Sequence, residues 1–159
     1  MPETEPACDH LRRDHRAIEE YLDTLLNALL NLAPERIPEI QAVVRSLQQL
    51  SAIHFAKEEE IFYPKLRPMA ADLLASLDAQ HEEVRELEWH VTELLAEPPQ
   101  TPDSRWLNEL RSLGIEFHDR IQHHIVDEEE HLFRLAGERL SLEDQTVLES
   151  AMARVVPHA

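Results

Sequence analysis

The chain has 159 residues, a length that suits one domain with its own buried core. Only two glycines occur, and aromatic residues make up 5 % of the chain, a composition that favours helices throughout and no sheet. The net charge of -17 repels nucleic acid phosphates and anionic lipid. We therefore expect neither nucleic acid nor a membrane as a partner.

Cysteine usage and the start of the chain indicate the compartment. The single cysteine, Cys8, excludes an internal disulfide and suits a reducing environment. Residues 1–6 are acidic and broken by proline, unlike a signal peptide, and no apolar run approaches the roughly 18 residues that a membrane span needs. We expect a cytoplasmic protein, with a protein partner compatible with the sequence but not identified by it.

Apolar residues spaced three and four apart predict helices in the first half of the chain. The first helix begins near Pro6 and runs to about Leu32. A proline-containing break at 33–38 leads to the second helix, which carries His54. Proline has no N–H to donate, so this helix is predicted to stop or kink near Pro64.

The second half of the chain repeats this arrangement. A third helix is predicted at about 69–96, followed by a proline-rich loop. Thr101 and Pro102 suit the cap and first turn of a fourth helix, which runs to about Ala136 with Gly137 as its stop.

A short final helix is predicted from Leu142 to Val156, because Ser141 and Asp144 resemble a capping box. Four long helices with short connections predict an all-α fold, an antiparallel up-down-up-down four-helix bundle with a short extra C-terminal helix. We expect a single domain over residues 1–159, with the bundle at about 6–137 and the short helix at about 142–156. Gly114, near the buried side of the fourth helix, permits either close helix approach or an opening.

Histidines and glutamates interrupt the apolar stripes of all four helices. The second helix carries a His-x-x-x-Glu motif, the fourth repeats it seventy positions later, and the first and third each place one histidine in an apolar slot. Residues four apart have Cβ atoms about 5–6 Å apart, so each motif can bind one ion with both side chains. The six candidate metal ligands are His15, His54, Glu58, His81, His124 and Glu128.

These buried groups need charge compensation, because an isolated ionised carboxylate in an apolar core is costly. No lysine or arginine shares their stripes at the required spacing. Two divalent or trivalent cations would neutralise the glutamates and use the imidazole lone pairs, as in carboxylate metal sites of four-helix bundles. Nitrogen and oxygen ligands without thiolate favour iron, then manganese or zinc, and copper less.

The ordered motifs resemble the hemerythrin-like, or HHE cation-binding, domain over roughly Asp9 to Leu135. The resemblance rests on an Asp-His-Arg setting at His15, His54-x-x-x-Glu58 followed by Glu59 and Phe-Tyr-Pro, His81 between Gln80 and Glu82, and His124-x-x-x-Glu128 followed by Glu129. It implies a non-haem di-iron centre, oxo- or hydroxo-bridged and also bridged by the two glutamates. It further implies that His15 and His54 hold one iron and His81 and His124 the other.

Two departures bear on function. Oxygen-carrying hemerythrins have a fifth histidine one turn after the third-helix ligand, where this chain has Arg85. They also have an aspartate five residues after the last histidine, where this chain has Glu128 at four and Glu129 at five. The missing imidazole implies a coordination position open to water, another side chain or a substrate.

The predicted function is therefore a di-iron protein that binds or reacts with oxygen, nitric oxide or hydrogen peroxide in the bundle core. One alternative is a catalase-like, peroxidase-like or nitric-oxide-detoxifying enzyme. Another is a metal-stabilised structural or interaction module.

Side chains near the motifs receive more modest predictions. His131, at the edge of the fourth-helix stripe, is a candidate to support or replace a ligand. Arg85 is expected to be a surface cation or a cover for the open position. Tyr21 and Tyr63 are expected to pack at the rim of the core, and the acidic residues that follow Glu58 and Glu128 should be mostly solvated.

Overall fold

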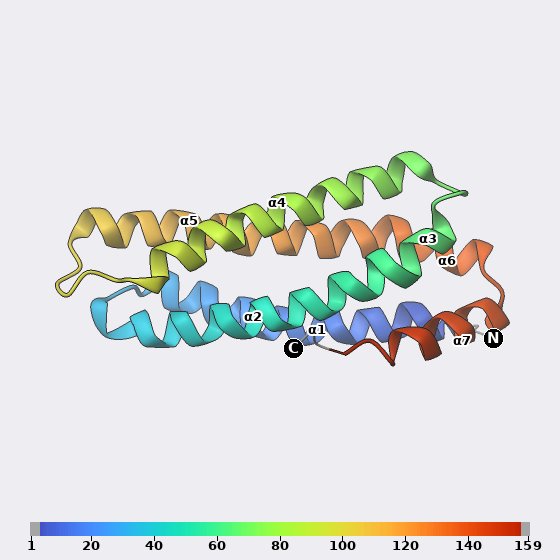
Figure 1. Cartoon of the computed structure of the whole chain (residues 1–159), viewed down its shortest axis with the longest axis horizontal. Helices are drawn as coiled ribbons and strands as arrows, with labels where there is room; N and C mark the ends of the chain where they lie inside the picture. Colours follow the sequence, from blue (N-terminus) through green and yellow to red (C-terminus); the bar gives the residue numbers. More distant parts are fainter. Residues whose placement is uncertain (1–3, 157–159) are drawn as a thin grey trace.

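The computed structural model describes residues 4–156, and every regular element within them is helical, as the composition predicts. Figure 1 shows the long helices lying side by side as a bundle, with a short helix, α7, at the C-terminal end of the chain. α7 packs against the first long helix. The long helices are α1 (Pro6–Leu30), α2 (Ile37–Lys57), α4 (Ala71–Ala96) and α5 (Ser104–Asp127), and the short helix is α7 (Leu142–Met152).

The helix starts follow local chemistry. A short 3-10 turn, η1 (Pro34–Arg36), leads into α2. Asp103, rather than the expected Thr101 and Pro102, caps α5, because its carboxylate accepts the backbone N–H of Trp106 at 2.9 Å. The capping box predicted at Ser141 and Asp144 is confirmed, although α7 ends at Met152, four residues before the predicted Val156.

A π-helical turn follows both α2 and α5, and the sequence pattern did not reveal it. η2 (Glu58–Phe62) leads into α3 (Tyr63–Leu66). As predicted, the helical segment ends close to Pro64, at Leu66, although the proline itself lies inside the last turn. The N–H of Tyr63 donates to the carbonyl of Glu58, five residues earlier, and Pro64 follows within the next helical turn, so the chain stays helical to Leu66.

The second π-helical turn, η3 (Glu128–Leu132), leads into α6 (Phe133–Arg139). The predicted stop at Gly137 is wrong, because α6 runs through this glycine to Arg139. A Cβ atom there would overlap the carboxylate of Glu5, so Gly137 makes room for a neighbouring segment. Both π turns begin at a glutamate of the repeated motif, and such turns are frequent at functional sites.

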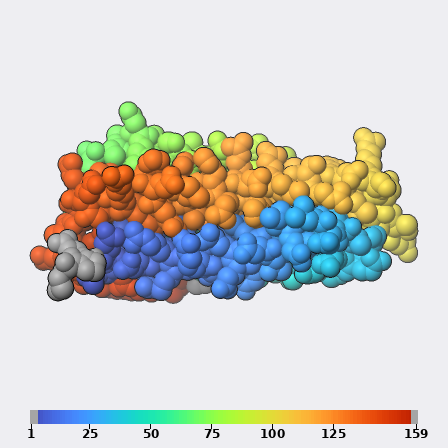
Figure 2. All heavy atoms as spheres, turned by 180° about the vertical axis from the view of Figure 1, so that it is seen from behind, coloured from blue at the N-terminus to red at the C-terminus, as the bar shows by residue number. Residues whose placement is uncertain are grey.

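Gly114 serves close helix approach rather than an opening. A Cβ atom at this position would lie 2.6 Å from Cδ1 of Leu29, a side chain of α1 that is fully buried. The glycine therefore lets α1 and α5 come together. Figure 2 shows the face on which these two helices lie along each other.

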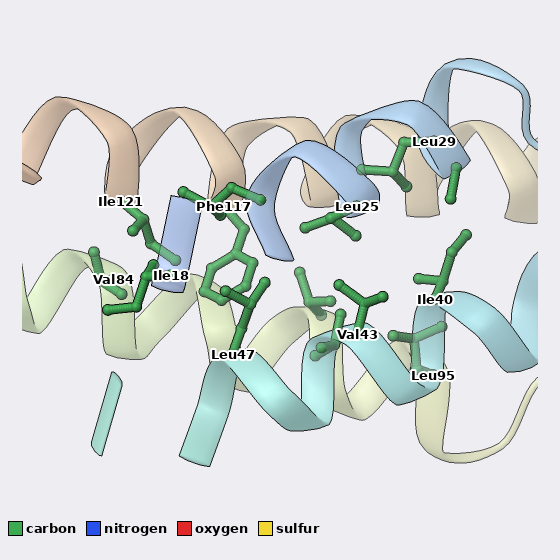
Figure 3. Close-up of a cluster of buried hydrophobic side chains, with 14 of the residues drawn as sticks. Ile18, Leu25, Leu29, Ile40, Val43, Leu47, Val84, Leu95, Phe117 and Ile121 are labelled. Carbon is green, nitrogen blue, oxygen red and sulfur yellow. The ribbon is translucent and has the colours of Figure 1, made fainter. Parts of the chain in front are cut away.

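Two hydrophobic clusters fill the bundle, one on each side of a polar layer. The larger cluster includes Leu25, Val43 and Phe117 (Figure 3). The smaller one includes Leu11 and Phe62. On α1 the chain passes from Leu11 in the smaller cluster, through a buried histidine, to Ile18 in the larger one. α4 crosses the layer in the same way, whereas the chain from α2 and from α5 reaches the smaller cluster only in the π turns that follow these helices.

None of the helices within residues 4–156 has a stretch long and apolar enough to cross a membrane.

Candidate functional site

The polar layer between the two clusters contains all six side chains that the sequence singles out, from α1, α2, η2, α4, α5 and η3. Each is at most 2 % exposed. Their potential ligand atoms fall into two groups, within each of which all the atoms lie within 4.8 Å of one another. The groups share both glutamates: one adds His15 and His54, and the other adds His81 and His124.

The short distances all involve the Nε2 atoms of the histidines. His15 Nε2 lies 3.1 Å from Glu128 Oε1, and His81 Nε2 lies 3.1 Å from Glu58 Oε1. His124 Nε2 lies 3.2 Å from Glu128 Oε1 and 3.0 Å from Nε2 of His81. Two imidazole nitrogens this close repel each other through their lone pairs unless a proton or a cation lies between or beside them.

The Nδ1 atoms point the other way, each to a hydrogen-bond acceptor outside the six. In the first half of the site, His15 Nδ1 donates to Glu129 at 2.7 Å, and His54 Nδ1 donates to Asp14 at 3.0 Å. Asp14 also accepts from the nearly buried Lys57 at 2.9 Å. These acceptors fix the ring orientation and leave Nε2 free to act as a ligand.

The second half repeats this pattern with different chemistry. His81 Nδ1 donates to Glu59 at 2.8 Å. His124 Nδ1 donates to the amide oxygen of Gln80 at 2.7 Å, and the Gln80 amide nitrogen donates to Asp127 at 2.7 Å. The donation to Asp127 orients the amide so that its oxygen faces the histidine. The pseudo-twofold repeat of the sequence therefore extends to the partners of the ligands.

The acidic residues that follow Glu58 and Glu128 are less solvated than predicted. Only the third member of each triplet, Glu60 and Glu130, is exposed. Glu59 and Glu129 are partly buried because they accept from the histidines, and each also binds an arginine. Because Glu59 and Glu129 directly follow Glu58 and Glu128, the sequence offered a reason to expect them near the site.

Arg85 binds glutamates outside the six converging side chains instead of covering them. Its guanidinium donates to Glu59 at 2.7 Å and to Glu82 at 2.8 Å, and it lies 5.4 Å from the ring centroid of Phe55. Of the two roles predicted for Arg85, the structure agrees with a surface cation, since the side chain is 40 % exposed. His131, the candidate substitute ligand, is exposed and lies outside the site.

Aromatic rings form the walls of the site. Phe55 stacks on His81 with centroids 3.9 Å apart, and Phe133 stacks on His15 at 5.4 Å. Tyr63 also stacks on His81, at 5.3 Å. Such apolar walls keep water from the polar layer and strengthen the electrostatic interactions inside it.

Tyr63 is not a rim residue, contrary to the prediction. It is fully buried, and its hydroxyl donates to Glu128 Oε2 at 2.6 Å and lies 3.2 Å from Nε2 of His81. Tyr21, by contrast, is 39 % exposed. The i→i+5 hydrogen bond of the π turn accounts for the difference, because it brings the side chain five residues after Glu58 towards the site.

The charges of the site shift the pKa values of its groups. Burial disfavours the charged form of His54, but the Glu58 carboxylate and the hydrogen bond to Asp14 outweigh this effect, so its pKa lies well above the ordinary histidine value. Burial also disfavours the charged form of His124, but the Glu128 carboxylate outweighs this effect and raises the pKa of His124 to about 10. Burial raises the pKa of Glu128, yet His124 and the other donors hold it well below its usual range.

The donor set fits a pair of cations. Among the described residues, Nε2 of His54 and Oε2 of Glu58 are buried without a hydrogen-bond partner, although such groups are almost always satisfied in folded proteins. Both atoms belong to the converging cluster. Cations bound there would use these lone pairs and offset the two carboxylates, whereas protons on the histidines offset them in the metal-free protein.

Comparison with known proteins agrees with this geometry. A search of curated protein sequences finds no match. The family model described as the hemerythrin HHE cation binding domain matches residues 7–136, a range that includes all six converging side chains. The chain therefore belongs to the hemerythrin HHE cation-binding domain family.

Proposed function

We propose that the buried cluster holds two iron ions and that oxygen, nitric oxide or hydrogen peroxide binds or reacts there. In this proposal His15 and His54 would hold one iron and His81 and His124 the other, and Glu58 and Glu128 would be shared by both. One observation carries the proposal. All four histidines are hydrogen-bonded outward through Nδ1 and converge inward through Nε2, which is the arrangement that metal-ligating histidines adopt.

The choice of iron rests on the donor set and on the family. Four imidazoles and two carboxylates without thiolate favour iron over the softer metals, with manganese or zinc as the next choices. The iron pair would supply electron exchange with a small ligand. The protein would hold the ions and exclude water with Phe55 and Phe133. Arg85 would not cover them, because it is directed to Glu59 and Glu82.

A reaction, rather than reversible binding alone, is favoured by Tyr63. Its hydroxyl is a buried donor 3.2 Å from Nε2 of His81, and it donates to Glu128. The single hydrogen of this hydroxyl bonds Glu128 in the metal-free protein and could turn to a ligand bound beside His81. A catalase-like, peroxidase-like or nitric-oxide-detoxifying enzyme is therefore the second candidate.

We further infer that the bundle is antiparallel, with up-down-up-down order, and that the bundle and α7 belong to one domain. The short connections between consecutive long helices support this topology (Figure 1). The cytoplasm remains the compartment that we propose, since a single buried cysteine suits a reducing environment.

The first experiment is the metal content of protein purified without an affinity tag from iron-supplemented cells. We expect about two irons per chain, as a paired carboxylate site requires. The variant His124→Ala should lose iron, while its neighbour His123, with a side chain 63 % exposed, gives a matched control in His123→Ala. Zinc alone, or no metal in a well-folded protein, would favour the structural module and contradict the proposal.

Spectra then separate the two redox candidates. A carrier or sensor should show a reversible absorbance change with oxygen or nitric oxide and no turnover. An enzyme should consume many equivalents of hydrogen peroxide or nitric oxide, and the variants His54→Ala and Glu58→Ala should abolish this turnover. Full turnover in both variants would exclude the histidine–glutamate cluster as the reaction centre.

A further inference from the structure

A small hollow lies between α2 and α4, next to the half of the cluster that contains His81. Its volume is about 240 Å³, and its lining includes Ser51, Phe55, Arg85 and Glu88. The Phe55 ring stacks on His81 at 3.9 Å and lies 5.7 Å from the ring of His124. A molecule in the hollow would therefore contact a side chain that itself contacts two histidines of the cluster.

The hollow contains one buried hydroxyl that no group among the described residues binds, and a half-buried carboxyl group beside it. Ser51 is 3 % exposed, and its hydroxyl is buried without a hydrogen-bond partner. Such a group is costly to bury unless something binds it. Glu88 is half-buried beside it, and burial raises the pKa of this carboxyl group to about 7, so that at neutral pH it is partly protonated and can donate a hydrogen bond.

The pseudo-twofold repeat shows that the hollow is specific to one half of the molecule. When His54 is paired with His124, Ser51 corresponds to Ile121 and Phe55 to Ile125; when His81 is paired with His15, Glu88 corresponds to Leu22. The three counterparts are buried members of the larger hydrophobic cluster. They lie on α1 and α5, two helices that pack against each other.

The charges around the hollow select against anions. Three carboxylates line it, those of Glu59, Glu60 and Glu88. The single cation is Arg85, which is already bound to Glu59 at 2.7 Å. An anionic ligand would be repelled, whereas an uncharged molecule with both donor and acceptor groups could use Ser51 and Glu88.

We propose that this hollow is the access and holding site for an uncharged hydrogen-bonding ligand of the class of hydrogen peroxide, which Ser51 and Glu88 bind before it passes Phe55 to the cluster. The inference rests on the proposed function, because it assumes a reactive centre behind Phe55. It narrows that function to a ligand that donates and accepts hydrogen bonds.

The first test uses metal-free protein and so does not depend on iron. In a Cys8→Ser background, the variants Ser51→Cys and Ile121→Cys place one thiol at the hollow and one at its filled counterpart. For each variant, the rate of labelling by uncharged methyl methanethiosulfonate is divided by the rate for the same variant in denaturant. This ratio should be at least about tenfold higher for Ser51→Cys than for Ile121→Cys, because thiol reactivity depends on access. The anionic sulfonatoethyl reagent should label it more slowly than the uncharged one.

The second test uses iron-loaded protein and a variant that copies the filled half. The double variant Ser51→Ile plus Glu88→Leu closes the hollow with side chains of the kind found at its counterparts. The rate constant of the absorbance change on mixing with hydrogen peroxide should fall by about tenfold or more, the effect of losing one or two hydrogen bonds. The control Ile121→Val, on the filled side, should keep the original rate.

The outcomes separate the two proposals. If wild-type iron-loaded protein responds to none of the three small ligands, the proposed function is wrong, and the access role falls with it. If the wild type responds to peroxide but the double variant responds equally fast, only the hollow proposal is overturned. Equal labelling of the two thiols, or faster labelling by the anionic reagent, overturns it as well.

Discussion

The buried hydroxyl of Tyr63 gives a prediction that can be tested without any metal. The substitution Tyr63→Phe removes one oxygen atom and keeps the ring that stacks on His81. It also makes this position the same as its counterpart in the other half, Phe133. The change therefore isolates the hydrogen bond from the hydroxyl to Glu128.

The expected cost follows from the geometry of that bond. The hydroxyl lies 2.6 Å from Glu128 Oε2, and both residues are fully buried. Hydrogen bonds to charged groups contribute about 1.5–3 kcal/mol, and no water is expected to replace the hydroxyl between two packed aromatic walls. We expect the free energy of unfolding of the metal-free protein to fall by about 2 kcal/mol.

Urea unfolding followed by far-UV circular dichroism at pH 7 measures this loss. With a slope of about 2 kcal/mol per M, the midpoint should fall by about 1 M. Tyr21→Phe is the matched control, because Tyr21 is 39 % exposed, and it should change stability by less than about 0.5 kcal/mol. A similarly small change in Tyr63→Phe would refute the idea that the hydrogen bond from this hydroxyl stabilises the buried carboxylate.

Three further predictions follow from the packing and charges. Gly114→Ala should lower the free energy of unfolding by about 1–3 kcal/mol, since the new Cβ would lie 2.6 Å from the buried Leu29 side chain; an unchanged urea midpoint would contradict this. Glu129→Gln should weaken iron binding, measured against a competing chelator, by about 10–100-fold, whereas exposed Glu130→Gln should not. The pKa of His124 is raised to about 10 in the metal-free protein, so the stability from its proton is complete below about pH 6.5 and is lost as the pH rises towards 10. The metal-free melting temperature should therefore fall over this range, and the gain on adding iron should grow; a rising metal-free value would contradict the assignment.

The sequence predicts the helices and the converging cluster because both depend on periodicity. Residues three and four apart share a helix face, so a histidine inside an apolar stripe must lie in the core. The two His-x-x-x-Glu motifs, at His54 and His124, then place a histidine and a glutamate on each of two buried faces. The long helices and the convergence of the six side chains could be predicted for this reason, whereas the division of the histidines into two pairs was implied by the family resemblance.

The π turns could not be predicted in this way, and other errors follow from them. A shift from i→i+4 to i→i+5 hydrogen bonding needs no special residue, so it leaves no mark in composition or periodicity. The shift explains why the chain stays helical through Pro64 to Leu66 and why Tyr63 lies inside the site. The partners of Nδ1 were also missed, because whether Asp14 or Gln80 faces a histidine depends on how neighbouring helices pack.

The two halves of the site share a plan but differ in chemistry, and the differences point in one direction. His54 donates to a carboxylate, Asp14, which makes its imidazole a more basic ligand, whereas His124 donates to the neutral amide of Gln80. A cation bound on the His124 half would thus receive less electron density from His124 than a cation on the other half would receive from His54. The Tyr63 hydroxyl lies on the same half, where the counterpart in the other half is a phenylalanine.

The hollow between α2 and α4 opens on that half as well, since its Phe55 wall stacks on His81. A weaker donor set, a buried hydroxyl and an approach for small molecules therefore coincide at one of the two positions. The other position has a carboxylate-supported histidine and a filled apolar wall that includes Ile121. From this asymmetry we infer that, with two ions bound as proposed, a small ligand would first meet the one held by His81 and His124, while the one held by His15 and His54 would stay closed to it.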